Sequence, residues 1–298
     1  MITRTLRASA AFVATTVALV GCTHKSIFSE ASSASVVDAK VTLRQIRNAT
    51  IKVEYAGTTF LIDPMLAPKG AYAAFPGTVN AHLRNPLVDL PLPAEEVAKA
   101  DAVIVTHTHL DHWDEAAKRS LPKDLPVFVQ DSDDADIVQK AGFVHVQVLG
   151  EGIDFKGTIL SRTGGQHGTD AMVQGRGKAL GKSSGVVFQR NGFKTVYVAG
   201  DTLWNEHVET ALARYKPDVI VLNTCYGRLV AYDGGFIMGK EDLYRAYQSA
   251  PQASIIASHM ETIAHCTHTR KSLTDFINQK QMSAERVLVP ADGQAYSF

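Results

Sequence analysis

One stretch in the first half of the chain decides the fold, Ala102-Val103-Ile104-Val105-Thr106-His107-Thr108-His109-Leu110-Asp111-His112. Its first four residues form a continuous apolar run, which is typical of a strand buried on both faces of a sheet. The run opens into a segment in which four of six residues are histidine or aspartate. Histidines two apart on extended backbone project to the same side, so both can reach one cation. The stretch therefore predicts a metal site at the end of a buried strand.

The residue types in this segment narrow the choice of metal. Imidazole nitrogen is a borderline-soft ligand and carboxylate oxygen is a hard one, a combination that suits zinc and also iron or manganese. A single histidine at a strand end is usually structural, and a pair is usually on the surface. Three histidines and an aspartate within six positions favour metal binding over both alternatives.

Predicted strands and helices alternate on both sides of this segment. The other predicted strands are residues 41–46, 50–55, 59–62, 127–130, 144–149, 158–162, 185–190, 195–199, 219–223, 254–258 and 286–289, and the predicted helices are residues 114–120, 135–141, 205–215, 240–249 and 269–280. Strand-rich runs with helices between them, in two similar halves, predict an α/β fold of layered sheets with helices outside.

Single polar residues follow later strands of this pattern. Asp201 and His259 lie within two residues of the end of a predicted strand, and His167 follows the predicted strand 158–162 by five residues. Open sheets tend to hold their ligands just beyond the ends of their strands.

The segment from Thr106 to His112 resembles the H-x-H-x-D-H motif of the metallo-β-lactamase superfamily. Later segments match the family in order, namely Gly164-Gly165-Gln166-His167-Gly168, Gly200-Asp201-Thr202 and Ser258-His259. The resemblance extends from about Val41 to the C-terminus. It implies a four-layer αββα sandwich with a binuclear metal centre at one edge.

Carried over residue by residue, the resemblance implies two ligand groups that share a bridge. His107, His109 and His167 would hold the first divalent metal ion, Asp111, His112 and His259 the second, and Asp201 would bridge both. Two such cations would lower the pKa of a water between them to near neutral pH, and the hydroxide formed in this way would attack the substrate. Asp111 would also be catalytic, as proton donor to the leaving group.

Many β-lactamases of this superfamily carry cysteine where this chain has Asp201, and an aspartate is more typical of the lactonase, phosphodiesterase and glyoxalase branches. A narrower resemblance, to ascorbate-phosphate-lactonase-like members, lies in Leu61-Ile62-Asp63-Pro64, Asn85-Pro86-Leu87-Val88-Asp89-Leu90-Pro91 and Ala291-Asp292-Gly293. We therefore expect a hydrolase of a small ester, lactone or related acyl compound. The alternatives are a phosphodiesterase on the same metal centre, iron-dependent oxygen chemistry, and a non-catalytic metal-binding lipoprotein.

Two further residues are candidates for supporting roles. Asp63 ends a predicted strand at a position that resembles the acid behind the family's metal ligands, where it would orient an imidazole; a turn carboxylate is the alternative. His265 follows His259 closely and could contact substrate, with helix capping and surface exposure as alternatives. The long segment 64–93 has no periodic pattern, so it is either a functional lid or a surface insertion.

Residues 1–22 predict a lipoprotein signal peptide. Arg4 and Arg7 precede an apolar run, which ends in the lipobox-like Leu19-Val20-Gly21-Cys22. Lipidation at Cys22 would anchor an exported protein to a bacterial membrane, residues 23–40 would form a flexible tether, and residues 41–298 would form the hydrolase domain. An ordinary signal peptide or an uncleaved anchor is the alternative.

Composition excludes several classes of function. Thirty lysines and arginines balance thirty aspartates and glutamates, and no basic cluster stands out, so no nucleic-acid partner is expected beside the small-molecule substrate. Apolar residues make up 45% of the chain, which argues against both disorder and a multi-span membrane protein. Cys225 and Cys266 could pair in an exported protein, but we expect two unpaired, mostly buried thiols.

Overall fold

The computed structural model of this protein describes residues 1, 2 and 40–298. The predicted lipidation site Cys22 and nearly all of the predicted signal peptide and tether lie outside the described residues. Within the described part, no helix has the length and apolar character needed to cross a membrane. The lipid anchor stays a prediction.

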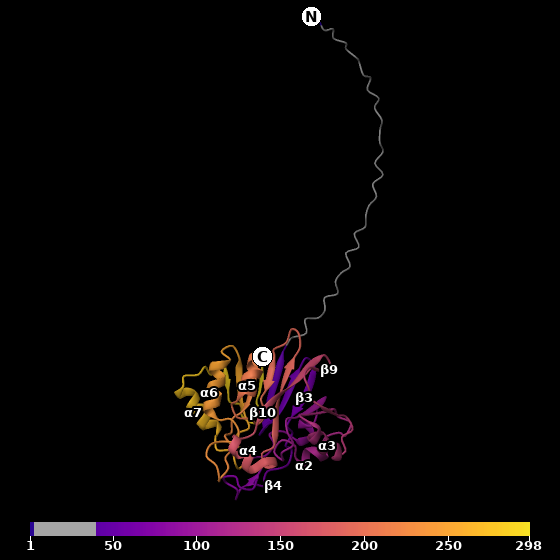
Figure 1. The fold of residues 1–298 in the computed structure, drawn as a ribbon. Coiled ribbons are helices and arrows are strands. Elements are labelled where there is room, and N and C mark those ends of the chain that lie inside the picture. Colours follow the sequence, from indigo (N-terminus) through magenta and orange to yellow (C-terminus); the bar gives the residue numbers. More distant parts are fainter. Residues whose placement is uncertain (3–39) are drawn as a thin grey trace. The chain divides into compact units, whose positions relative to one another are not determined.

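The described residues from Lys40 onward contain two seven-stranded mixed sheets that pack face to face (Figure 1). The first has the order β16-β1-β2-β3-β6-β7-β8, and its β3, β6, β7 and β8 run parallel. Its strands are β1 (Val41–Arg47), β2 (Thr50–Tyr55), β3 (Thr58–Ile62), β6 (Ala102–Val105), β7 (Val127–Val129), β8 (Val146–Val148) and β16 (Ala295–Ser297).

The second sheet has the order β15-β14-β13-β12-β11-β10-β9 and repeats this plan, because β12, β13, β14 and β15 run parallel while the other neighbours are antiparallel. Its strands are β9 (Ile153–Phe155), β10 (Thr158–Gln166), β11 (Lys182–Gln189), β12 (Val196–Val198), β13 (Val219–Asn223), β14 (Ser254–Ser258) and β15 (Val287–Leu288). A two-stranded sheet of β4 (Tyr72–Ala73) and β5 (Arg84–Asn85) lies in the long segment 64–93.

Three buried clusters account for the layers. Side chains of both sheets, such as Phe60 and Val221, form the cluster between them. The outer face of the first sheet packs with Trp113 under the helices α1 (Ala94–Val97), α2 (Glu115–Ser120) and α3 (Ser132–Lys140). The outer face of the second sheet packs under α5 (Glu206–Tyr215), α6 (Lys240–Ser249) and α7 (Arg270–Gln279). This arrangement confirms the predicted four-layer αββα sandwich.

Several short elements differ from the expectation. Neither α4 (Asp170–Arg176) with its following 3-10 turn (Gly177–Ala179), nor β9, nor β16 was predicted, and β16 pairs with β1 at the edge of the first sheet. The strands span only three residues, too few for a period to show. The sequence of α4 contains Gly175, a residue that weakens helices. The N-cap of α4 is Thr169, whose side chain accepts a hydrogen bond from the backbone N–H of Met172.

Candidate metal centre

The seven candidate ligands lie where strands end. His107, His109, Asp111 and His112 occupy the loop after β6, and the other three follow strands of the second sheet, His167 after β10, Asp201 after β12 and His259 after β14. Because both sheets present these ends at one edge of the sandwich, residues more than 150 positions apart meet there. The structure brings together all seven side chains.

Three histidines form the first candidate group. The nearest nitrogens of His107, His109 and His167 lie within 4.8 Å of one another, and Nε2 of His107 is 3.0 Å from Nδ1 of His109. Nδ1 of His167 donates to the carbonyl of Leu180 at 2.9 Å, so Nε2 of the neutral ring has no hydrogen and offers a lone pair. That buried Nε2 has no hydrogen-bond partner in the described structure. A cation would satisfy it, so these side chains fit the metal that the sequence predicts.

Asp111, His112 and His259 form the second candidate group. Nε2 of His259 lies 3.3 Å from Nε2 of His112 and 3.4 Å from Oδ2 of Asp111. The other nitrogen of His112, Nδ1, is 2.8 Å from Oδ2 of Asp63 and so carries the proton. All three side chains are buried, which makes a shared cation the natural partner for two imidazole nitrogens that face one another.

Asp201 lies between the two groups. Its Oδ2 is 3.2 Å from His112 Nε2, 3.5 Å from His167 Nε2 and 3.6 Å from His259 Nε2. Its other oxygen, Oδ1, accepts a hydrogen bond of 2.7 Å from the side-chain amide of Asn223 at the end of β13. The single oxygen Oδ2 therefore faces both groups, as a bridging ligand must.

Asp63 lies behind the second group. Its carboxylate accepts hydrogen bonds from the backbone N–H and the hydroxyl of Thr106, both at 2.7 Å, in addition to its contact with His112. These bonds fix the ring of His112 with Nε2 toward the site, which is the orienting role expected of a residue behind a metal ligand. The turn-only alternative does not account for the contact with His112.

Backbone geometry at the site is unusual. Asp63 and His259 are both buried and have φ angles of +47° and +70°, in the left-handed region. Such conformations cost about 1–3 kcal/mol each and concentrate at functional sites. Gly200 also has a positive φ, and a Cβ there would collide with the carbonyl oxygen of Ser184. Only glycine therefore allows the turn that places Asp201.

Charges among the candidate ligands compensate one another. Burial raises the pKa of Asp201, but His112 and His259 outweigh it and hold the pKa well below its ordinary range. Burial lowers the pKa of His112, but Asp201 and Asp63 outweigh it and raise the pKa well above its usual value. Burial raises the pKa of Asp111, but His112 and His259 lower it, and the net pKa lies below the ordinary value. Protons on His112 and His259, whose pKa values are raised, therefore balance the carboxylates, and a cation would displace them.

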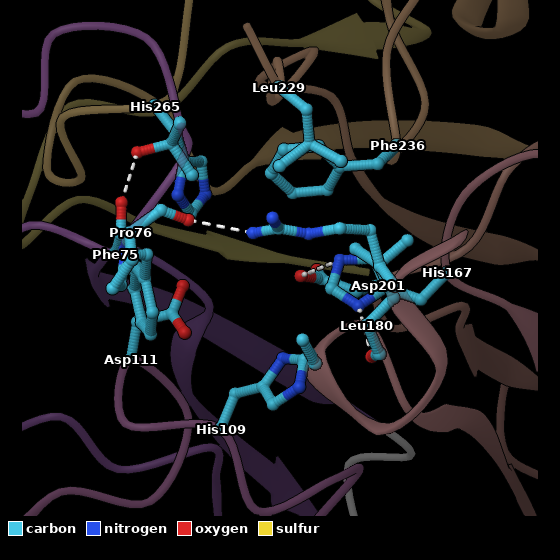
Figure 2. A pocket seen from close by; sticks show the side chains of 13 residues that line it. Phe75, Pro76, His109, Asp111, His167, Leu180, Asp201, Leu229, Phe236 and His265 are labelled. Atoms are coloured by element: carbon cyan, nitrogen blue, oxygen red, sulfur yellow. Dashed lines mark hydrogen bonds and ion pairs between the residues drawn. The ribbon is translucent and has the colours of Figure 1, made fainter. Parts of the chain in front are cut away.

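A pocket of about 200 Å³ opens onto the candidate ligands (Figure 2). His109, Asp111, His167 and Asp201 line one part of it, while Phe75, Pro76, Thr78, Arg176, Ala179, Leu180, Leu229, Phe236 and His265 supply the rest. Segment 64–93 thus forms part of the wall, which favours the functional interpretation over a surface insertion. Its Pro76 carbonyl accepts a hydrogen bond of 2.7 Å from Arg176 of α4.

His265 lies in this wall and only 5% of it is exposed. The surface alternative is therefore wrong. The N-cap of α7 is Thr269, so His265 does not cap a helix either. Phe75, Arg176, Phe236 and Asn223 were not predicted for the site. Of these, only Asn223 carried a signal, as a polar residue that ends a buried strand.

Cys225 and Cys266 form a disulfide, so the expectation of unpaired thiols is wrong. The chain after His259 folds back, and Cys266 pairs as an isolated bridge with Gly227, which brings the two cysteine Cα atoms to 4.9 Å. A sequence separation of 41 residues gave no hint of this return. The sulfur of Cys266 lies 3.6 Å from Nδ1 of His259, so the disulfide braces the loop that carries this candidate ligand.

Comparisons with known proteins bear on this site. Residues 58–260 match the family model described as Beta-lactamase superfamily domain. The UPF0173 protein YddR of Bacillus subtilis (strain 168) is 44% identical over 257 residues, which cover 86% of this chain and 99% of YddR. The chain belongs to the UPF0173 family. Its members include a metal-dependent hydrolase of Nanoarchaeum equitans (strain Kin4-M), 27% identical over 56% of this chain and 73% of the relative.

Solved structures agree with this assignment to the UPF0173 family. A possible metal-dependent hydrolase from Veillonella parvula DSM 2008 is 43% identical and superposes with a TM-score of 0.84, over 86% of this chain and 98% of that one. An isothiocyanate hydrolase from Delia radicum gut bacteria is 45% identical and superposes with a TM-score of 0.83, over 86% of this chain and 99% of that one. The protein is a metal-dependent hydrolase with the metallo-β-lactamase fold. The narrower resemblance to ascorbate-phosphate lactonases stays a prediction.

Proposed function

We propose that this UPF0173 hydrolase cleaves isothiocyanates, R–N=C=S. We further propose that the seven candidate ligands hold two divalent cations, with zinc as the first choice and manganese or iron as alternatives. The observation that carries the proposal is the small, largely apolar pocket that opens onto both ligand groups. The 45% identity to a protein solved as an isothiocyanate hydrolase supports it. Small esters and lactones remain the second candidate class, because water attacks their carbonyl carbon in the same way.

The pocket walls favour a small apolar substrate. Phe75, Leu180, Leu229 and Phe236 surround a volume of about 200 Å³. Among the described lining residues, Arg176 is the one lysine or arginine, and its guanidinium already donates to a backbone carbonyl. Because the two cations could compensate the fixed negative charge of a phosphodiester, the preference rests on the wall and not on charge. Its mainly apolar side chains favour a substrate with uncharged, apolar substituents.

The chemistry follows from the residues around this pocket. When bound, the cations would lower the proton affinity of a shared water and polarise the bond under attack. Asp111 borders the pocket as a carboxylate, so it can accept a proton from the attacking water and pass it to the substrate nitrogen. Asp201, held at Oδ1 by Asn223, keeps the two ligand groups in place around the reacting carbon.

The overall reaction is R–N=C=S + H2O → R–NH2 + COS. The water oxygen forms a bond to the central carbon, and the electron pair of the C=N double bond moves to nitrogen, which takes the proton from Asp111. The thiocarbamic acid formed in this way, R–NH–C(=O)–SH, then passes its acidic proton to nitrogen as its C–N bond breaks, which gives an amine and carbonyl sulfide. No oxidant or further reactant is required.

A substrate panel tests the proposal. Zinc-loaded protein is incubated with benzyl isothiocyanate, p-nitrophenyl acetate, γ-butyrolactone and bis-p-nitrophenyl phosphate, and the amine, acid or phenol released is measured. We expect the isothiocyanate to have the highest kcat/KM, and Asp201→Asn and chelator-treated protein to lose that activity. Preference for the ester or lactone would move the assignment to the second class. Preference for the phosphodiester would contradict both.

We also propose that the protein is exported and lipid-anchored through Cys22. The disulfide between Cys225 and Cys266 supports export, since such bonds persist in oxidising compartments. Cell fractionation tests this: the native chain is expected in the membrane fraction, and Cys22→Ser is expected to release it or leave it unprocessed. A native chain in the soluble fraction, or a Cys22→Ser chain that is processed like the native chain and has the same membrane share, would contradict lipidation at this residue.

A further inference from the structure

His265 is a buried polar side chain that the candidate metal centre does not use. It is 95% buried, and neither Nδ1 nor Nε2 has a hydrogen-bond partner among the described residues. An unpaired buried polar atom costs about 1–3 kcal/mol. Native proteins seldom leave such atoms without a role, and sites of this kind call for a partner such as an ordered water, an ion or a ligand.

The position of this ring is closely determined by its surroundings. The ring centroid of His265 lies 4.9 Å from that of Phe236, edge to face, and 5.5 Å from that of Phe75. The backbone N–H of Arg228 donates to the carbonyl of His265 at 3.1 Å, and the next residue, Cys266, is in the disulfide. The unpaired nitrogens are therefore held in a fixed wall.

The ring belongs to the pocket and not to the metal groups. It borders the same pocket as Asp111 and Asp201, and Figure 2 shows it across the pocket from His167. Its centroid lies 6.5 Å from that of His259, and none of the candidate metal groups among the described residues includes it. What remains for its nitrogens to meet is a molecule in the pocket.

The charge state of the ring fits a hydrogen-bonding role. Burial lowers the pKa of His265 to about 3, so at neutral pH the imidazole is uncharged and carries one N–H and one lone pair. An uncharged ring would not attract an inhibitory anion strongly, yet it still offers one directed donor. The ring N–H of His265 is thus a donor in the pocket wall that has no acceptor among the described residues.

We propose that His265 is a catalytic residue whose ring N–H donates a hydrogen bond to the substrate heteroatom on which negative charge develops. In an isothiocyanate that atom is the terminal sulfur, and in an ester it is the carbonyl oxygen. His265 itself transfers no proton: as the water oxygen adds to the carbon, negative charge spreads over the sulfur and the nitrogen that Asp111 protonates, and the hydrogen bond from His265 to the sulfur strengthens. This role rests on the proposed function.

Kinetics of three zinc-loaded variants test the role. His265→Phe removes the donor and keeps a planar ring, His265→Gln restores an N–H, and His145→Phe is a matched control at an exposed histidine. We expect His265→Phe to lower kcat for benzyl isothiocyanate about 100-fold, the usual loss of one oxyanion donor, with KM and zinc content nearly unchanged. His265→Gln should recover much of that loss. Wild-type kcat in His265→Phe, or equal losses in both variants, would overturn the role.

Binding of an unreactive probe separates this role from the proposed function. N-benzylthiourea has the same N–C–S core, and its contact with His265 is observed as a shift of the ring ¹⁵N–¹H resonance, assigned by its absence in His265→Gln. We expect a shift in the wild-type protein and at least about tenfold weaker binding in His265→Phe. If the wild-type protein cleaves none of the probe substrates, the proposed function fails. A thiourea that binds without shifting this resonance overturns the His265 contact, whether or not the protein is active.

Discussion

Asn223 gives the sharpest test of how the candidate centre is built. Its amide donates to Oδ1 of Asp201 at 2.7 Å, and only 2% of Asn223 is exposed, so solvent does not weaken the bond. A hydrogen bond to a charged acceptor contributes about 1.5–3 kcal/mol. Since about 1.4 kcal/mol corresponds to a factor of ten, Asn223→Ala should weaken zinc binding about 10- to 100-fold.

Competition with a colorimetric zinc chelator near neutral pH measures this loss, with the exposed Asn191→Ala as control. Urea unfolding of the metal-free proteins is measured in parallel, because part of the energy could appear as lower stability. Zinc affinity within about twofold of wild type, with unchanged stability, would refute the idea that Asn223 fixes the carboxylate of Asp201.

Three other perturbations have defined outcomes. Asp63→Asn should weaken zinc binding by about 10- to 100-fold, as for other residues behind a metal ligand, because the contact with His112 Nδ1 loses its charge; an unchanged affinity would contradict the orienting role. Burial lowers the pKa of His112 and of His259, but the nearby carboxylates, Asp201 first among them, together raise both above the ordinary value, so zinc must displace protons. Affinity should therefore rise from about pH 5 to 8, and calorimetry in two buffers should detect proton release; a flat profile would argue against it. Replacing Cys225 and Cys266 by serine should lower the free energy of unfolding by about 4 kcal/mol for a 41-residue loop, and reduced wild-type protein should match the variant.

The metal-binding part of the site was open to prediction because strand and ligand are adjacent in sequence. The buried run Ala102–Val105 is β6 as predicted, and the loop after it contains His107 to His112. Asp201 and His259 follow the same rule in the second sheet. Apolar strands are recognisable locally, and their parallel pairing brings their ends to one edge.

The substrate-facing part of the site was not open to prediction in the same way. Phe75 lies in a segment without periodicity, and Arg176 ends a helix weakened by glycine. Phe236 lies in the irregular segment between β13 and α6. Each becomes part of the pocket only through tertiary packing, so their local sequence carries no signal. The pairing of Cys225 with Cys266 was missed for the same reason, because the chain reversal that joins them has no local pattern.

The parallel strands β12, β13 and β14 have a consequence for how this protein could change its substrate. Each delivers one group to the centre, Asp201, Asn223 and His259, from its own terminus. The ladder hydrogen bonds that hold the sheet together thereby also set the spacing of these candidate site residues. Segment 64–93 and α4 share none of those bonds, so exchanging them for other loops should alter which molecules enter while the catalytic core stays assembled.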